Sequence, residues 1–469
     1  MNIIMSYPSY LEYFSSAIEG VSTAAFKIAP TSNNAVSSHQ QISFNLPQNC
    51  LLDMRKLRMQ FQVTSTGSFT RLPPLASAYF NRISIEVGGQ TISSFENANV
   101  LDEILRNNLQ IEVDPVNEHS TIQRKNDPFS ATAITAQETY PTDDNKAFFS
   151  IDLGTLARSI QPSILAMQFL PQLQIILHLA ENAVCASPSN INTLANFVAA
   201  GSQGTYSIVN HNLIAECYDV ADGSLMAMYQ QTMQDQGYLE LTYENWTSFS
   251  DVFNQVTRFS SSAQSLNKIV ATFRRGTAVA PLAAAYNAAN GAVAVRGYNN
   301  ELIASAANVG FVANSLGQPE TQGAVYQSAF FTQTAPIAAA SLTGGVPKAA
   351  TLEPTLNFSI NSVKQPSYNC KASGWYDATK SGWGVSRTKS NSLAEFMLHR
   401  FSICQRLDLP DSKALRVMSG LNLKASNANL TLEVTGNASA ATTVDNVLVF
   451  LAASNILRVG IGKQVQILH

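Results

Sequence analysis

The residue types best suited to metal binding and nucleophilic chemistry are present, but they are not spaced for either task. The histidines are scattered along the chain: His39, His119, His178, His211, His399 and His469. The cysteines are far apart and form no Cys-x-x-Cys pair: Cys50, Cys185, Cys217, Cys370 and Cys404. Metal centres use His and Cys at short, regular spacings. We therefore expect no metal site, an ordinary strand histidine at His178, and buried free thiols in a reducing compartment.

Short acidic, glycine-containing and basic motifs also predict no binding site. Asp143 and Asp144 lie in a turn-like PTDDNK stretch, where a solvated turn is favoured over a pair of calcium ligands. Residues 460–462 (Gly-Ile-Gly) lack the third glycine and the strand–helix context of a dinucleotide site. Two basic pairs are not interleaved with aromatic residues as a nucleic-acid site would be: Arg124 with Lys125, and Arg274 with Arg275. Salt bridges between subunits explain these pairs more simply.

The segment 374–389 (GWYDATKSGWGVSRTK) contains Trp375 and Trp383, two of the three tryptophans of the chain. An aromatic loop of this kind can line a glycan site, but an aromatic-rich loop at a subunit contact is the favoured interpretation. The Asn-x-Ser/Thr triplets are expected by chance in so Asn- and Ser-rich a chain, and we expect no glycosylation at Asn245, Asn357, Asn429 or Asn437.

The acidic residues show no suggestive pairing of the kind that glycoside hydrolysis needs. An enzyme built on this sequence would require two carboxylates that converge in a deep pocket. We therefore predict no enzymatic activity, and no catalytic, cofactor-binding or metal-ligating residues.

Composition narrows the function classes further. Charged residues make up 13% of the 469 residues, against roughly 25% in a typical soluble chain. The hydrophobic fraction of 45% argues against intrinsic disorder, and the net charge of −3 argues against a generally basic nucleic-acid binder. Because charge keeps protein surfaces soluble and apart, we expect much of this surface to face other protein. The N-terminus has no basic region typical of a secretory signal, and no apolar run is long enough for a membrane helix.

Period-two hydrophobicity predicts a first β-rich block from residue 41. Leu57, Met59, Phe61 and Val63 alternate with polar residues, as in a half-buried strand. Further strands are expected at 83–87 and 90–94, joined by a Gly-Gly hairpin turn. The remaining strand candidates of this block are 147–153, 170–179 and 207–220.

One amphipathic helix is predicted over 99–109, followed by a polar loop over 110–146. Asn99 can cap this helix, and a buried stripe is expected from Leu101, Ile104, Leu105 and Leu109.

A second β-rich block opens at about residue 236. Its strand candidates are 237–249, 266–273, 356–361, 420–425, 429–434 and 446–452, with a short helix at 392–401. Between them, the Ala-, Gly-, Asn-, Ser- and Thr-rich segment 276–352 is too long for a structureless loop in a compact domain. We interpret it as an ordered excursion with small strands of its own; a partly disordered insert is the alternative.

The first 40 residues are interpreted as an N-terminal arm. Leu11, Phe14 and Ile18 would form one face of a short amphipathic helix over 8–19, and 27–40 is expected to be a flexible linker. A helix packed on its own domain or on a neighbouring subunit is favoured over a membrane-surface helix, because the polar face lacks Lys and Arg.

Many short strands, long polar insertions and few helices together predict an all-β fold. The expected architecture is two tandem eight-stranded jelly-roll β-sandwiches with long loop insertions. The predicted domains are the arm (1–40), a first jelly roll (41–222), a linker (223–235) and a second jelly roll (236–469) that carries the insertion 276–352.

Three ordered segments resemble the double jelly-roll major capsid proteins of large eukaryotic DNA viruses, virophages, Polinton-like elements and related phages. Residues 85–105 (IEVGGQTISSFENANVLDEIL) are similar to the strand, Gly-Gly-Gln turn, strand and helix of that family. Residues 148–179 look like its strand and proline-containing passage into a long strand, and 445–467 like its final strand. The chain departs from the family's pattern at Gly-Ile-Gly-Lys (460–463), where many relatives have a Gly-Met-Gly-like end, and in the linker.

The resemblance implies a structural major capsid protein. Three copies would form a homotrimeric, pseudo-hexameric capsomer, and such capsomers would tile the shell of an icosahedral virus assembled inside the host cell. The implied partners are the chain itself, neighbouring capsomers, and penton and minor capsid proteins, with no sequence-specific nucleic acid and no cofactor. The arm would lie under the shell and touch neighbouring capsomers, minor proteins or an internal viral membrane. The excursion 276–352 would be the dominant tower. The alternative is a tandem β-sandwich carbohydrate-binding, spike or tail protein that binds glycans through Trp375 and Trp383.

Overall fold

The structure is a computed structural model that describes most of residues 21–468. Outside its description lie 1–20, 32–34, 67–75, 109–145, 154–158, 185–204, 221–223, 387–392, 394–395, 398–399, 410–418, 425–428, 437–443, 445 and 469. Between 275 and 352 it describes 286–287, 292–293, 333–337, 342–343 and 346–347. The predicted helix over 8–19, the predicted loop 110–146 except Lys146 (the first residue of strand Lys146–Asp152), and most of the excursion 276–352 therefore lie outside the described residues.

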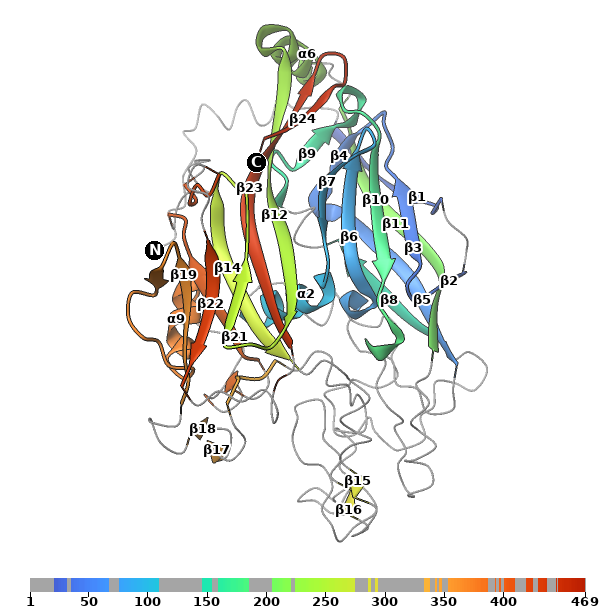
Figure 1. Ribbon diagram of the computed structural model, residues 1–469. Coiled ribbons are helices and arrows are strands. Elements are labelled where there is room, and N and C mark those ends of the chain that lie inside the picture. Colours follow the sequence, from blue (N-terminus) through green and yellow to red (C-terminus); the bar gives the residue numbers. More distant parts are fainter. Residues whose placement is uncertain are drawn as a thin grey trace.

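Two β-sandwiches stand side by side with their long strands running in roughly the same direction (Figure 1). The first contains a seven-stranded sheet of order β8-β5-β11-β4-β9, with β1 and β2 also paired to β11. These strands are β1 (Val21–Ile28), β2 (Ala35–Ser37), β4 (Leu51–Asp53), β5 (Arg58–Thr66), β8 (Lys146–Asp152), β9 (Ile164–Ala166) and β11 (Thr205–Val220). Its facing sheet has the order β3-β10-β6-β7: β3 (Gln41–Asn45), β6 (Phe80–Val87), β7 (Gln90–Phe95) and β10 (Leu173–Leu179).

The second sandwich is built from a five-stranded and a four-stranded sheet. The larger sheet contains β12 (Tyr238–Val252), β14 (Leu266–Arg274), β21 (Ser402–Arg406), β23 (Asn446–Gly460) and β24 (Val465–Leu468). The smaller sheet contains β13 (Val256–Phe259), β19 (Thr355–Ile360), β20 (Val363–Gln365) and β22 (Leu430–Thr435). The expected all-β fold of two tandem jelly rolls with few short helices is confirmed, and short strands such as β4 and β9 extend its sheets.

Three α-helices and several single 3₁₀ turns are found among the described residues. The helices are α2 (Ala98–Asn108), α6 (Ser224–Gln236) and α9 (Trp375–Trp383). The 3₁₀ turns are Met54–Lys56, Ala76–Tyr79, Met167–Phe169 and Asn182–Val184. Helix α6 fills the connection between the last strand of the first sandwich and β12, where the sequence predicts a linker.

Alternation of apolar and polar residues creates the strands of both sandwiches. Along β5 the apolar residues Met59, Phe61 and Val63 are buried, while Arg58 and Gln60 are exposed. The predicted β6–β7 hairpin is confirmed, and its turn residues Gly88 and Gly89 have φ of +59° and +79°, a region that favours glycine. The sequence pattern therefore places one face of each sheet in a core, which in the first sandwich includes the stacked rings of Phe61 and Phe149.

Helix α2 confirms the predicted helix and buries the expected stripe of Leu101, Ile104 and Leu105, but the cap differs. The helix begins at Ala98, and the carbonyl oxygen of Asn97 accepts the bond from Leu101 N at 3.0 Å. Asn99 is buried inside the first turn, where its amide donates to the carbonyl of Ala78 at 3.2 Å. The prediction that Asn99 is the capping residue is therefore wrong, because the helix begins one residue before it; its Oδ1 still accepts a bond from the first-turn amide of Val100 at 2.9 Å.

Residues 21–28 and 35–37, which the sequence places in the N-terminal arm, are strands of the first sandwich. Strand β1 pairs with β11 from Val21–Val220 to Ile28–Leu213. β5 and β4 pair with one edge of the 16-residue β11, and β1 and β2 pair with its other edge, so the backbone groups on both edges have partners. Because residues 22–27 are exposed on both faces, β1 shows no alternation that would reveal a strand in the sequence. The interpretation of 27–40 as a flexible linker is also wrong, because residues 27–28 and 35–37 belong to strands β1 and β2.

The predicted strand at 420–425 is also wrong. Its described residues make a single antiparallel bridge between Leu421 and Leu266, with backbone bonds of 2.8 and 2.9 Å. The amide of Leu423 donates to Ala263 O at 2.9 Å, and Ala263 lies before the start of β14. The segment therefore does not pair along β14. At 392–401, where a helix is predicted, the described residues Leu393, Phe396 and Met397 are helical.

Candidate functional site

The seam between the two sandwiches joins them into one body. A bridge between Gln161 and Thr242 makes two backbone bonds of 2.8 and 2.9 Å across it. Nearby, Ser159 Oγ accepts a bond from Glu244 N at 3.1 Å. Because the two bonds between Gln161 and Thr242 join the backbones of separate domains, they fix the relative position of the sandwiches as a sheet ladder would.

Side chains of β7 and β12 extend this seam. The Tyr243 hydroxyl donates to Ile92 O at 2.9 Å, and Ser93 Oγ donates to Asn245 Oδ1 at 2.5 Å. Burial raises the pKa of Tyr243, so this hydroxyl stays a donor at neutral pH. Apolar residues of the second sandwich, including Trp246 and Phe450, pack into the same cluster as the core of the first. The seam is therefore a continuous hydrophobic core, and not a hinge.

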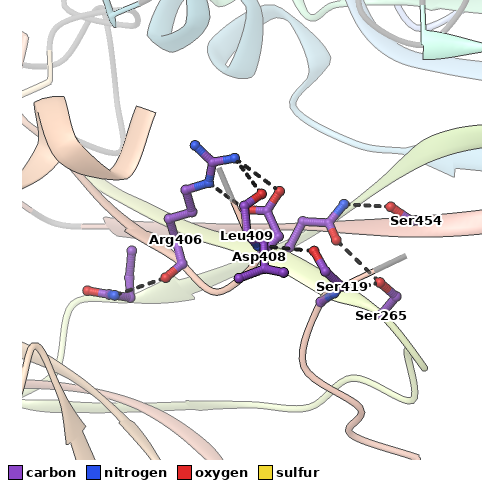
Figure 2. Close-up of polar contacts among 9 residues, drawn as sticks. Ser265, Arg406, Asp408, Leu409, Ser419 and Ser454 are labelled. Carbon is purple, nitrogen blue, oxygen red and sulfur yellow. Dashed lines mark hydrogen bonds and ion pairs between the residues drawn. The ribbon is translucent and has the colours of Figure 1, made fainter. Parts of the chain in front are cut away.

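A polar cluster at the end of β21 is built around the ion pair of Arg406 and Asp408 (Figure 2). Arg406 Nε and Nη2 donate to the two carboxylate oxygens of Asp408 at 2.7 and 3.4 Å, and Nη2 also donates to Leu409 O at 3.1 Å. The Asp408 carboxylate is only 2% exposed. The backbone N of Leu409 in turn donates to Ser419 Oγ at 3.0 Å. The cluster thus ties together the two chain segments that flank residues 410–418.

The same cluster reaches the central strands of the larger sheet. Ser265 Oγ accepts from Gly420 N at 3.1 Å, and Asn267 Nδ2 donates to Ser454 Oγ at 2.7 Å. The second bond connects β14 and β23 through side chains in addition to their backbone ladder, and the first connects residue 420 to the start of β14 (Figure 2). We interpret this arrangement as a structural clamp.

The chain leaves the second sandwich after β14 and re-enters it at the same place. Thr334 N donates to Phe273 O at 3.0 Å, and Phe401 N donates to Gln333 O at 3.0 Å. Residues 333–337 are buried, and Ala335 and Ile337 belong to the core of the second sandwich. The expected boundary of the excursion at 352 is therefore wrong, because 333–337 pack as core.

The expected small strands are present as two hairpins, β15 (Tyr286–Asn287) with β16 (Ala292–Val293) and β17 (Leu342–Thr343) with β18 (Val346–Pro347).

Large apolar side chains are exposed at several turns and edges. They are Phe26, Val252, Val256, Val363, Tyr368, Leu409 and Ile461. Val252 and Val256 flank the β12–β13 turn, and Ile461 lies in the β23–β24 turn formed by 461–464. Scattered exposed apolar residues are ordinary on a monomer, so no single one marks a contact.

The tryptophans expected in a loop are in the core. Helix α9 occupies most of 374–389, and Trp375 and Trp383 are buried on the side that also carries Thr379. Both expectations for this segment, a subunit-contact loop and a glycan-binding loop, are therefore wrong for these side chains. The spacing of four between Trp375, Thr379 and Trp383 is the sequence signal for this helix, and the glycines at 374, 382 and 384 obscure it.

The other sequence candidates are dispersed. His178 is a strand residue of β10, as predicted, and Arg82 Nη2 donates to its Nε2 at 2.5 Å. Burial, followed by the charge of Arg82, lowers the pKa of His178. Arg274 is buried at the end of β14, whereas the sequence predicts that it forms a salt bridge between subunits. The remaining candidates lie outside the described residues: Arg124, Lys125, Asp143, Asp144 and Arg275.

The cysteines are free thiols, as expected, wherever they are described: Cys50, Cys217, Cys370 and Cys404. Burial raises the pKa of Cys404 to about 12 and that of Cys370 to about 11, so neither is a nucleophile at neutral pH. The sequence predicts isolated thiols, but Cys50 and Cys217 lie with their sulfurs 3.0 Å apart. Among the glycosylation triplets, Asn357 is buried and donates to Pro366 O and Tyr368 O.

In the part of the chain that the structure describes, no three His, Cys, Asp or Glu residues gather into a group that could hold a metal ion. Within that same part, no helix is long and apolar enough to cross a bilayer. What the described side chains build is a rigid pair of sandwiches with closed polar clusters.

No family model and no curated protein matches the sequence. Solved structures match its fold over nearly the full length. PBCV-1 VP54, fitted into a cryo-EM reconstruction of the virophage Sputnik, has a TM-score of 0.58 at 11% identity and covers 96% of this chain and 97% of that chain. The quasi-atomic model of the PBCV-1 virus capsid has a TM-score of 0.55 at 12% identity, with the same coverage.

The Faustovirus major capsid protein is similar as well, with a TM-score of 0.53 at 9% identity over 93% of this chain and 90% of that chain. At these identities the likeness is one of fold. It agrees with the two tandem jelly rolls described above, and with the double jelly-roll architecture that the sequence resemblance implies.

Proposed function

We propose that this chain is a structural major capsid protein that works by assembly and has no enzymatic activity. The observation that carries the proposal is the seam: two jelly rolls are locked side by side by a shared core, in the architecture of solved capsid proteins. A shell subunit must transmit load between neighbours, and a continuous core resists relative motion of its halves.

The subunit shape suits a pseudo-hexameric capsomer. Each chain carries two similar sandwiches, so a homotrimer presents six sandwiches around its axis. Such a unit can meet six neighbours on the face of an icosahedral shell. Many lateral contacts, each weak, then hold the shell together through multivalency. The low content of charged residues, 13%, lowers the desolvation cost of burying those contacts.

The excursion after β14 is the proposed tower of the capsomer. Its chain ends meet at the Phe273–Thr334 bond, so the segment between them can project from the sandwich without disturbing it. The hairpin β15–β16 lies beyond the ends of the sandwich strands, at the end of the molecule opposite α6 (Figure 1). We place contacts around the trimer axis in this segment.

The remaining assignments follow from the capsid role. The protein would reside in the virion after assembly inside the host cell. Its partners would be further copies of itself, penton and minor capsid proteins, and an internal viral membrane reached by residues that precede β1. No sequence-specific nucleic-acid contact is proposed, because the net charge is −3.

Sedimentation and electron microscopy of the purified full-length protein test this function. We expect a stable trimer in solution and pseudo-hexagonal particles in negative stain, which pack side by side as the protein is concentrated. A protein that remains strictly monomeric under native conditions would refute the proposal.

A further inference from the structure

Cys50 and Cys217 are brought together by sheet pairing within the first sandwich. Cys50 directly precedes β4, in which Leu51 pairs with Tyr218 and Leu52 pairs with Cys217 itself. The two sulfurs are 3.0 Å apart, although 167 positions separate the residues in the sequence. Their proximity is therefore a property of the folded sheet.

The backbone holds both residues in place. The carbonyl oxygen of Cys50 accepts a bond from Met167 N at 3.1 Å, which ties it to the end of β9. Cys217 lies in the middle of the neighbouring ladder, where β1 pairs with it from the other side through Ala24. A disulfide bond length is about 2.05 Å, so bond formation needs the sulfurs to move by only about 1 Å.

The two thiols differ in access. Cys217 is only 3% exposed, whereas Cys50 is half-buried. Cys50 is therefore the residue that a soluble oxidant reaches first, and Cys217 is placed to resolve the product. The other described cysteines, Cys370 and Cys404, are buried free thiols of the second sandwich.

We propose that Cys50 and Cys217 are a redox modification site that a disulfide oxidant such as oxidised glutathione closes into an intramolecular disulfide. The Cys50 thiolate attacks one glutathione sulfur, and the first glutathione leaves as a thiol. The Cys217 thiolate then attacks the Cys50 sulfur, and the second glutathione leaves. The protein loses two electrons and two protons, and one glutathione disulfide becomes two glutathione thiols.

The chemistry gives the reaction a pH dependence. Burial and the neighbouring Cys217 thiol raise the pKa of Cys50 to about 12, and burial raises the pKa of Cys217. Because the thiolate is the reactive form, the bond forms slowly near neutral pH and faster in alkaline solution.

The biological timing rests on the proposed capsid function. A shell protein is made in a reducing cell interior, where the thiols stay free, and then meets oxidising surroundings after release. The bond would then tie β4 to β11 and lock the first sandwich of each released subunit.

Peptide mass spectrometry of the full-length protein tests the proposal. Protein purified under reduction is transferred to oxidised glutathione at alkaline pH, alkylated without unfolding, and then digested. We expect a linked peptide pair that contains Cys50 and Cys217, is lighter by two hydrogens, and separates on addition of dithiothreitol. Cys370 and Cys404 in the same sample serve as internal controls and should remain unlinked.

Two substitutions complete the test. Cys50→Ser and Cys217→Ala should each abolish the linked pair, and Cys217→Ala should leave Cys50 as a stable mixed disulfide with glutathione. A persistent mixed disulfide on Cys50 in the unsubstituted protein, or both thiols still free after oxidation, would overturn the proposal. Trimer formation measured under reduction is independent of this readout, so failure of the cysteine site and failure of the capsid function are distinguishable.

Discussion

Asn108 at the end of α2 donates a hydrogen bond of 3.0 Å to the hydroxyl of Ser402 at the start of β21. The two residues belong to different sandwiches and are 294 positions apart. Both are buried, and the Asn108 amide also donates to Ile104 O at 2.8 Å, one turn back along its helix. This one side chain therefore closes the end of α2 and joins it to the second sandwich.

Asn108→Ala is expected to lower the free energy of unfolding by about 1–3 kcal/mol, because it leaves buried polar groups without this partner. Urea unfolding of the two proteins measures the difference. Ser250→Ala, at an exposed position of β12, is the matched control and should change stability little. Equal stability of Asn108→Ala and the parent protein would show that the seam bond is dispensable.

Arg406→Ala is expected to destabilise the second sandwich by about 3 kcal/mol, since it leaves the buried Asp408 carboxylate without its bidentate ion pair. The pair formed by Lys380 and Asp377 offers a comparison, because Asp377 is 86% exposed. Asp377→Ala should therefore cost less than about 1 kcal/mol. The thermal unfolding midpoints of the two variants measure this contrast. Similar midpoints would mean that burial does not strengthen the Arg406–Asp408 clamp.

Stability is expected to fall in mild acid through His211. This residue is buried against Phe44, and no described residue hydrogen-bonds to either ring nitrogen. Burial lowers its pKa below the value of about 6.5 that it has in the unfolded chain. The unfolded state therefore binds more protons as the pH falls through about 6.5, so the free energy of unfolding falls with it.

The urea midpoint at pH 7.5 and at pH 5.5 tests this dependence. His211→Phe removes the titrating ring and should reduce the loss of stability between the two pH values. The pKa of His178 is shifted in the same direction, so His178→Gln is measured in parallel. An unchanged pH dependence in His211→Phe would contradict the assignment.

Gly382→Ala is expected to displace α9 from β21. A Cβ atom at this position would overlap the carbonyl oxygen of Cys404, a backbone atom that cannot rotate away. Overpacking of this kind costs about 1–3 kcal/mol. Ser381→Ala, at the exposed neighbouring position, is the control and should be neutral. Thermal unfolding compares the two, and a neutral Gly382→Ala would refute the close contact.

Replacement of residues 276–332 by a short Gly-Ser linker is expected to leave both sandwiches folded, because Phe273 and Thr334 are already bonded at the base of the excursion. If the excursion carries contacts around the trimer axis, the variant should sediment as a monomer with an unchanged circular dichroism spectrum. A variant that remains a fully stable trimer would assign the trimer contacts to another surface.

Local patterns were sufficient to predict most of the strands and the helix α2. The alternation in β5, the Gly-Gly turn after β6 and the apolar stripe of α2 depend on residues only a few positions apart. The wide spacing of the His and Cys residues can likewise be seen in the sequence alone. These features could be predicted because backbone geometry and side-chain period are local properties.

Contacts between distant segments could not be predicted in this way. Strand β1 pairs with the edge of β11 opposite β5 and β4, and nothing in the sequence of β1 specifies this partner. The side chain of Asn99 lies inside the first turn of α2, where it bonds the distant Ala78 carbonyl as well as the amide of Val100. In α9 the glycines suggested a loop, whereas the buried Trp375 and Trp383 stabilise a helix on the core.

By itself, the sequence determined an all-β chain of two jelly rolls, poor in charge and without spaced catalytic or metal-binding residues. Only the tertiary structure decided that the sandwiches share a core, that Asn108 meets Ser402, and that Cys50 lies beside Cys217. The physical reason is that strand pairing and core packing bring together residues more than a hundred positions apart, where no local period or spacing specifies the partner.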